Sequence, residues 1–187
     1  MSRLEDHPDI ATLGDLYSRF PEPFLKVSPL GHEIMRGDAP LTPAERELVA
    51  AYVSALNGCG YCHGIHAEVA RVFGVDADLL AALADDPDSA PVEARMRPIL
   101  ALARQLTEAP ARMTDAHAQA VRDAGWDDRA VVFTVAVTAY FNMMNRLVEG
   151  FGLVHSDANA ARAGAFLAGA GYLGMRNAAA ARAEREG

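Results

Sequence analysis

Apolar side chains recur every three or four residues along most of the chain, which is the spacing that amphipathic helices require. The clearest case begins at residues 42–45, where a Thr-Pro-Ala-Glu sequence is a helix start signal. Apolar positions then fill more than one side of the segment until an Asn-Gly pair at 57–58, which is a helix stop signal. We therefore predict a largely buried helix over 43–57.

The same pattern predicts further helices on both sides of this one. Asp76, Thr114 and Asp127 are residues that commonly cap a helix N-terminus, and each precedes a new apolar repeat. The expected helices cover residues 10–20, 30–35, 59–73, 76–84, 91–107, 114–125 and 127–151. No segment shows convincing strand alternation bounded by turns. The fold class should be all-α, in a helical bundle.

The two ends of the chain differ from its middle. Residues 1–40 hold five of the ten prolines and only short helical patterns, which indicates an N-terminal arm that packs on a larger body. An Ala-Arg-Glu tail at about 178–187 should fray. The helices expected at 43–57 and 127–151 look alike, which suggests an internal duplication. We expect residues 1–187 to form one domain.

Composition and charge exclude several classes of partner. The 187 residues carry a net charge of −8 and show no basic patch, so we expect no nucleic-acid partner. The acidic N-terminus does not resemble a secretory signal, and we expect a cytoplasmic protein. The longest near-apolar run, at 130–141, is far shorter than the roughly 20 residues of a membrane span, so we expect no membrane partner. Helices that are apolar on several sides favour a homo-oligomer.

Both cysteines of the chain lie in the segment Cys59-Gly60-Tyr61-Cys62, and His66 follows four residues later. In a reducing cytosol such a pair is more often redox-active or metal-binding than structural. On one helix, Cys62 and His66 face the same way, so the imidazole can reach the sulfur. The start of a helix also favours a thiolate. The pattern is typical of a reactive dithiol.

Glu47 is the last charged side chain before a segment, 48–67, that contains no Asp, Glu, Lys or Arg. If the two helices form an antiparallel hairpin, Glu47 lies roughly 15 Å from the turn and His66 roughly 12 Å from it on the second helix. The two side chains therefore reach a similar depth. A carboxylate that orients a histidine beside a thiol is a common way to activate a nucleophile.

These residues resemble the signature of a known family. The spacing Glu-x11-Cys-x2-Cys-x3-His is similar to that of the AhpD-like alkylhydroperoxidases in the carboxymuconolactone decarboxylase superfamily, and so are the Asn-Gly lead-in and the tyrosine between the cysteines. The segment at 140–146, Tyr-Phe-Asn-Met-Met-Asn-Arg, resembles a second segment of the peroxidase-related branch. The likeness extends from about residue 10 to residue 155.

The resemblance implies an AhpD-like bundle, assembly into trimers or hexamers, and dithiol peroxidase activity on a hydroperoxide. By this likeness Glu47 and His66 form a proton relay through water, while Cys59 and Cys62 cycle between dithiol and disulfide. An external dithiol or thiol protein would donate the electrons, with no bound cofactor. We expect Cys62, which is nearer His66, to be the activated thiol and Cys59 its partner, although Cys59 at the helix end could instead meet the reductant.

Other interpretations of the cluster remain open from the sequence. Cys59, Cys62 and His66 could supply three zinc ligands, with His63 as a fourth, and the string Cys-x-x-Cys-His also occurs where haem is attached. The cysteines could equally be buried packing residues. Glu47 could simply compensate the helix dipole, as many residues at this position do.

Two alternative functions follow from these interpretations. The chain could be a redox-sensing helical oligomer without turnover, or a decarboxylase or lactone-handling member of the same superfamily. A polar patch late in the chain also has two interpretations, because it could form an ordinary i,i+3 ion pair or border the active-site pocket. It comprises Asn142, Asn145, Arg146 and Glu149.

Overall fold

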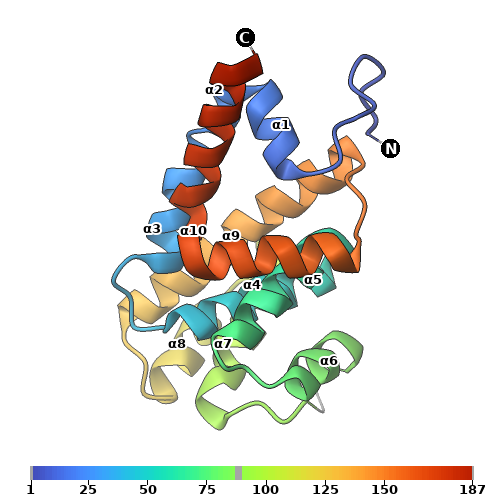
Figure 1. The fold of residues 1–187 in the computed structure, drawn as a ribbon. Coiled ribbons are helices and arrows are strands. Elements are labelled where there is room, and N and C mark those ends of the chain that lie inside the picture. The colour runs from blue at the N-terminus through green and yellow to red at the C-terminus, as the bar shows by residue number, and fades with distance from the viewer. Residues whose placement is uncertain (1, 87–89, 187) are drawn as a thin grey trace.

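The computed structural model describes residues 2–86 and 90–186, and in those residues it contains helices and no strand (Figure 1). The all-α prediction is confirmed. The α-helices are α1 (Leu13–Arg19), α2 (Pro21–Phe24), α3 (Val27–Arg36), α4 (Pro43–Leu56), α5 (Gly60–Val72), α6 (Ala77–Asp85), α7 (Arg97–Glu108), α8 (Asp115–Asp123), α9 (Asp128–Phe151) and α10 (Asp157–Glu186). Short 3₁₀ helices cover Ala94–Met96 and Pro110–Arg112.

Helix α4 is the centre of the bundle, and every residue from Arg46 to Ser54 is buried. The expected capping box is present, because the Thr42 side chain accepts from the backbone N–H of Glu45 while the Glu45 carboxylate accepts from that of Thr42. Gly58 then adopts a left-handed conformation with φ of 67°, which reverses the chain into α5. Helices α4 and α5 form the antiparallel hairpin that the sequence predicts.

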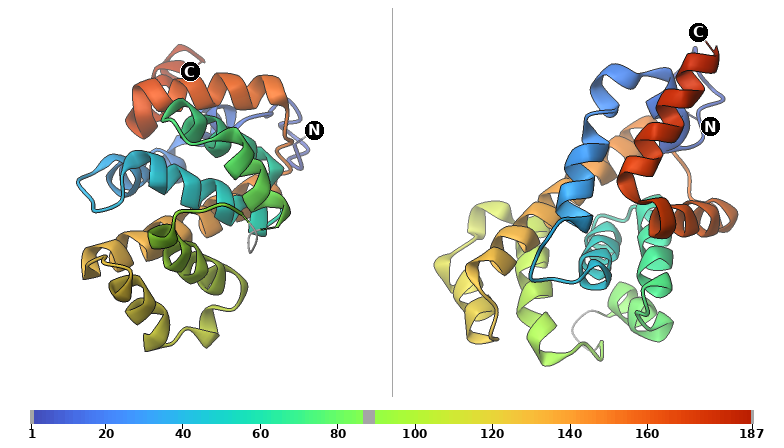
Figure 2. Two further views of the ribbon diagram at one scale, coloured as in Figure 1. Left: turned by 90° about the horizontal axis from the view of Figure 1, so that it is seen from below. Right: turned by 60° about the vertical axis from the view of Figure 1, so that its left-hand side comes forward.

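Helix α9 supplies the second long wall of the core. Asp127 caps it, as predicted, and its 24 residues pack against α4 and α7 (Figure 2). By length and composition alone this helix could cross a membrane, a property that the buried core helix of a soluble protein shares. The internal duplication suggested by α4 and α9 stays a prediction.

Helices α2 and α10 were not among the expected helices. Prolines explain two differences in the limits of helices that were expected. Helix α3 begins at Val27 and includes Pro29, because a proline in the first turn loses only an N–H that has no partner within the helix. Helix α7 begins at Arg97 rather than near residue 91, since Pro98 suits the first turn and not the interior of a helix.

A sharp bend at Gly171 divides helix α10 into two arms. The first arm lies against α5, and the second turns away to run beside α1 and α3 (Figure 1). Gly171 has φ of 64° and ψ of −173°, a conformation that is essentially restricted to glycine. The N-terminal helices therefore pack on the end of the chain. Helix α10 continues to Glu186. The fraying expected at about 178–187 stays a prediction.

Replacing Gly171 by alanine should destabilise the fold by about 1–3 kcal/mol, because a Cβ is strained at this φ and ψ. Urea denaturation of the two proteins measures the difference. Gly169→Ala is the matched control: its Cβ would meet no atom within 4 Å, and alanine favours a helix more than glycine does. Equal losses in the two variants would contradict the assignment of strain to Gly171.

Candidate active site

A largely apolar cavity of about 590 Å³ lies between helices α1, α5, α9 and α10. Cys62 and His66 line it, one turn apart on the same face of α5, as the helical spacing predicts. The remaining walls are mainly aromatic and aliphatic side chains. A reactive sulfur and an imidazole therefore open into a space that can hold an organic molecule.

Glu47 and His66 are in direct contact across the hairpin. The Oε2 atom of Glu47 lies 2.6 Å from Nδ1 of His66, and the carboxylate is fully buried. The ring of His66 is also held by edge-on packing against Phe141, with 4.4 Å between ring centroids. The bond to Glu47 fixes Nδ1 and leaves Nε2 for other chemistry, and no residue in the described parts of the chain hydrogen-bonds Nε2.

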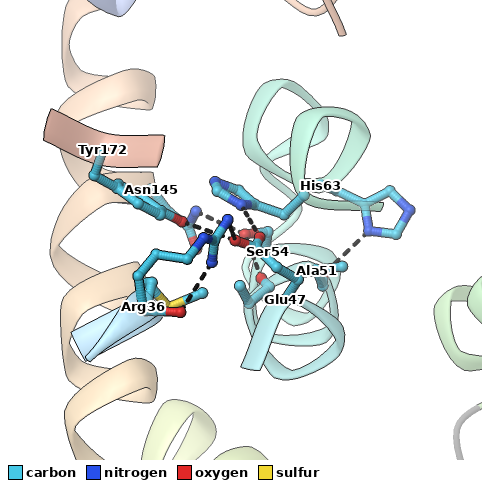
Figure 3. Close-up of polar contacts among 10 residues, drawn as sticks. Arg36, Glu47, Ala51, Ser54, His63, Asn145 and Tyr172 are labelled. Carbon is cyan, nitrogen blue, oxygen red and sulfur yellow. Dashed lines mark hydrogen bonds and ion pairs between the residues drawn. The ribbon is translucent and has the colours of Figure 1, made fainter. Parts of the chain in front are cut away.

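Two further residues, which sequence reasoning missed, hold the other oxygen of Glu47. Nη2 of Arg36 lies 2.7 Å from Oε1, and the hydroxyl of Tyr172 donates to the same atom at 3.3 Å. Figure 3 shows both side chains approaching Glu47 from the side opposite to His63. Burial by itself raises the pKa of Glu47, but His66 and Arg36 outweigh it, and the pKa lies below its usual value. Glu47 is therefore a charged carboxylate with a fixed orientation.

The two cysteines are free thiols with different surroundings. Cys59 is the N-cap residue of α5, and its side chain has no exposed surface. Cys62 is 3% exposed and lines the cavity, whereas Cys59 does not. Only Cys62 is placed to meet a molecule in the cavity.

The protonation of the two thiols is shared between them. A hydrogen bond from Cys62 lowers the pKa of Cys59. The same contact with Cys59 raises the pKa of Cys62 well above its usual value, and burial adds to the effect. The first proton therefore leaves the pair easily and the second with difficulty. The first thiolate forms on Cys59, whereas the thiol that faces the cavity is that of Cys62.

Replacing Cys59 by serine should lower the pKa of Cys62, because the variant removes the neighbouring sulfur that disfavours a thiolate there. The pH dependence of thiolate ultraviolet absorbance measures this pKa. The single pKa of the variant is compared with the two pKa values of the wild-type titration. If the pKa of Cys62 in the variant were equal to or above the second pKa of the wild type, the effect of Cys59 on Cys62 would be contradicted.

No hydrogen bond joins Cys62 and His66 in the part of the chain that the structure describes. A proton that moved from the thiol to Nε2 would therefore need a bridging molecule in the cavity, and the relay through water stays a prediction. His63 does not take part, because its Nδ1 lies 3.0 Å from the carbonyl oxygen of Ala51 and its ring points away from Glu47 (Figure 3). The site thus uses one of the two histidines beside the cysteines.

A network of amides on α9 borders the cysteine pair. The Nδ2 atom of Asn57 donates to the Oδ1 atoms of Asn142 and Asn145, at 3.2 and 2.9 Å. These bonds fix the amide of Asn145, whose Nδ2 donates to Ser54 Oγ at 3.0 Å. A hydrogen bond from Asn145 also acts to lower the pKa of Cys62, against the larger effect of Cys59.

The other two members of this polar patch have separate partners. Arg146 donates to the backbone and side-chain oxygens of Asn142, and among the described residues it forms no ion pair with Glu149. Glu149 lies beside Cys59 instead and acts to raise its pKa. The patch therefore lies beside the cysteine pair, but none of its four residues lines the cavity.

The described residues contain no group of three or more His, Cys, Asp and Glu side chains arranged to hold a metal ion.

Comparisons with known proteins agree with one another on the kind of protein that this chain resembles. The family model described as the carboxymuconolactone decarboxylase family matches residues 21–105. No curated protein matches the chain. Among solved structures, an uncharacterized peroxidase-related protein from Silicibacter sp. TM1040 is similar, with 29% identity, a TM-score of 0.74, and 78% of this chain and 76% of that chain covered.

Two further solved structures share the fold. One is an uncharacterized peroxidase-related protein with an alkylhydroperoxidase AhpD core from Ralstonia eutropha JMP134, with 26% identity, a TM-score of 0.74, and 80% of this chain and 78% of that chain covered. The other is a protein of unknown function from Agrobacterium tumefaciens, with 21% identity, a TM-score of 0.66, and 75% and 95% covered. At this lower identity the likeness to the Agrobacterium tumefaciens protein concerns the fold alone.

Proposed function

We propose that this chain is a thiol-dependent peroxidase, because residues 21–105 match the carboxymuconolactone decarboxylase family model and the fold is similar to that of two peroxidase-related proteins, one of them with an AhpD core. In this proposal Cys59 and Cys62 cycle between dithiol and disulfide, and Glu47 with His66 moves the proton. The observation that carries the proposal is the buried Glu47–His66 pair, 2.6 Å apart, at the wall of the cavity that Cys62 also lines. A purely structural ion pair would not need to open beside a thiol.

The proposed reaction begins when the Cys62 thiol loses its proton to Nε2 of His66 through water. Glu47 stabilises the imidazolium that forms, because its charge is held beside Nδ1. The thiolate attacks the terminal oxygen of the hydroperoxide, so an S–O bond forms as the O–O bond breaks. The leaving alkoxide takes the proton from His66 and departs as an alcohol, leaving a sulfenic acid on Cys62.

The second half of the proposed cycle restores the dithiol. The thiol of Cys59 attacks the sulfenic sulfur of Cys62, and the disulfide forms with release of water. An external dithiol or a thiol protein then reduces the disulfide by exchange, so no bound cofactor is required. Such a reductant is available in the cytoplasm, where we propose that the protein works.

We also propose that the protein assembles as a trimer or hexamer. Helix α9 leaves Val132, Val135 and Met143 exposed, with fractions of 62%, 38% and 38%, and no charged side chain occurs between Arg129 and Arg146. An uncharged exposed face of this length favours contact with another subunit. Light scattering should give a mass several times that of the 19.9 kDa chain, and a monomeric mass would contradict the assembly.

A steady-state assay across organic hydroperoxides, with lipoyl-type and thioredoxin-type donors, tests the function directly. We expect hydroperoxide consumption that depends on both the protein and the donor. Absence of turnover with every pair would contradict the proposal. If the disulfide then formed reversibly and changed the assembly, the protein would be a redox sensor instead.

A further inference from the structure

Tyrosine side chains form part of the cavity wall. The four tyrosines that line it are Tyr17, Tyr61, Tyr140 and Tyr172. Two of them already have partners within the protein. The hydroxyl of Tyr61 accepts from the backbone N–H of Leu13 at 3.1 Å, and that of Tyr172 donates to Glu47. These two hydroxyls therefore have structural roles.

The hydroxyls of Tyr17 and Tyr140 have no such partner. Their side chains are 1% and 5% exposed, and neither hydroxyl hydrogen-bonds to any residue in ranges 2–86 and 90–186. Neither hydroxyl oxygen is among the buried side-chain atoms without a partner, so both oxygens are accessible from the cavity rather than enclosed by protein. Phenylalanine would fill the same space without presenting an O–H group. A molecule bound in the cavity can therefore accept hydrogen bonds from both hydroxyls.

Tyr17 and Tyr140 line the same cavity as Cys62. Burial raises the pKa of Tyr17, and negative charge on Cys62 raises it further. Burial also raises the pKa of Tyr140, with Tyr17 and Cys62 adding to the effect. The two phenols therefore stay protonated, and each can donate a hydrogen bond. Tyr140 is held in place at Gly31, where an added Cβ would overlap its hydroxyl oxygen.

Resting on the peroxidase function proposed above, we infer that Tyr17 and Tyr140 bind the oxygen atoms of the hydroperoxide and hold them in front of Cys62. As the thiolate attacks, the O–O bond breaks and its electron pair moves to the leaving oxygen. Fixed O–H donors stabilise the charge that develops on this oxygen until the proton from His66 arrives. The apolar remainder of the cavity then accommodates the organic group.

The variants Tyr17→Phe and Tyr140→Phe test this inference, with cumene hydroperoxide as the probe. Each should lower kcat/KM by roughly 10- to 100-fold, because each removes one donor to the breaking bond. Tyr52→Phe is the matched control, since Tyr52 is a buried tyrosine of α4 outside this cavity. Its kcat/KM should remain close to that of the wild type.

Two other measurements separate peroxide binding from a structural role. Alkylation of Cys62 by iodoacetamide needs the thiolate but no peroxide oxygen, so its rate should be unchanged in both variants. The unfolding temperature should stay close to that of the wild type, because each variant removes only a hydroxyl that faces the cavity. A lower unfolding temperature, or alkylation that slows as much as peroxide reduction, would overturn the inference.

The outcomes also distinguish this inference from the proposed function. If the wild type turns over and both phenylalanine variants keep kcat/KM within about two-fold of it, the tyrosines do not bind the peroxide. If the wild type reduces no hydroperoxide at all, the peroxidase function fails and the inference fails with it.

Discussion

Replacing Cys62 by serine is expected to abolish hydroperoxide turnover, with a loss of at least roughly a thousand-fold. The reason is geometric, because Cys62 lines the cavity and Cys59 does not. A serine hydroxyl at this position keeps the size of the side chain but is a far weaker nucleophile near neutral pH. The measurement is kcat/KM for an organic hydroperoxide with excess dithiol.

Cys59→Ser provides the contrast. This variant keeps the attacking sulfur but has no partner thiol, so one equivalent of hydroperoxide should be consumed while the sulfenic acid on Cys62 persists. Trapping with a sulfenate-specific reagent and mass spectrometry should locate the adduct on Cys62. An adduct on Cys59 in the Cys62→Ser variant, formed at the same rate, would exchange the two assignments. Full turnover in both variants would contradict the dithiol cycle.

The variant Glu47→Gln should lose activity and stability together. An amide can still contact His66, but it cannot stabilise the imidazolium, so kcat should fall by roughly 100-fold. The same change leaves the charge of Arg36 without its partner in a site where the side chain is only 13% exposed. Breaking a buried ion pair by removing one partner typically costs about 3–5 kcal/mol. Steady-state kinetics and urea denaturation measure the two effects.

Glu68→Gln is the matched control for this loss. Glu68 also pairs with an arginine, Arg71, at 2.7 Å, but on the surface of α5. Exposed pairs contribute little to stability because water screens them, so this variant should unfold close to the wild type. A similar loss of stability in both variants would show that burial does not make the Glu47 ion pair more important to stability than an exposed pair.

The pH dependence of stability gives a further check on Glu47. Its pKa in the folded protein lies below the usual value of 4.5, so the folded state binds this proton less readily than the unfolded state does. The stability that Glu47 contributes is therefore present above pH 4.5 and is lost as the pH falls through the folded pKa. The difference in unfolding free energy between the wild type and Glu47→Gln should shrink on acidification below this range. A difference independent of pH would contradict the ion pair.

The sequence by itself determined the features that depend on neighbouring residues. The capping box at Thr42, the turn at Gly58 and the start of α9 at Asp127 are local backbone preferences, and the structure has all three. The meeting of Glu47 and His66 could also be predicted, because a tight turn between two helices fixes how far each residue lies from it. One short segment of sequence therefore contained half of the candidate site.

The other half was decided only by the tertiary structure. Arg36 comes from the N-terminal arm and Tyr172 from the far end of the chain, and no local pattern marks either residue as a partner of Glu47. Their approach depends on α10 bending at Gly171, which looks like any other glycine in a segment rich in alanine and glycine.

The same limit applies to the two unpaired tyrosines. Tyr17 and Tyr140 are more than one hundred residues apart in the sequence, and each fits the apolar pattern of its own helix. Only the packing of α1 against α10, and of α9 beside α5, brings their hydroxyls to the cavity that Cys62 lines. Local preferences fix where helices begin and end, whereas contacts between distant segments depend on how the whole core packs, and that is why the sequence identified the dithiol and the structure identified what surrounds it.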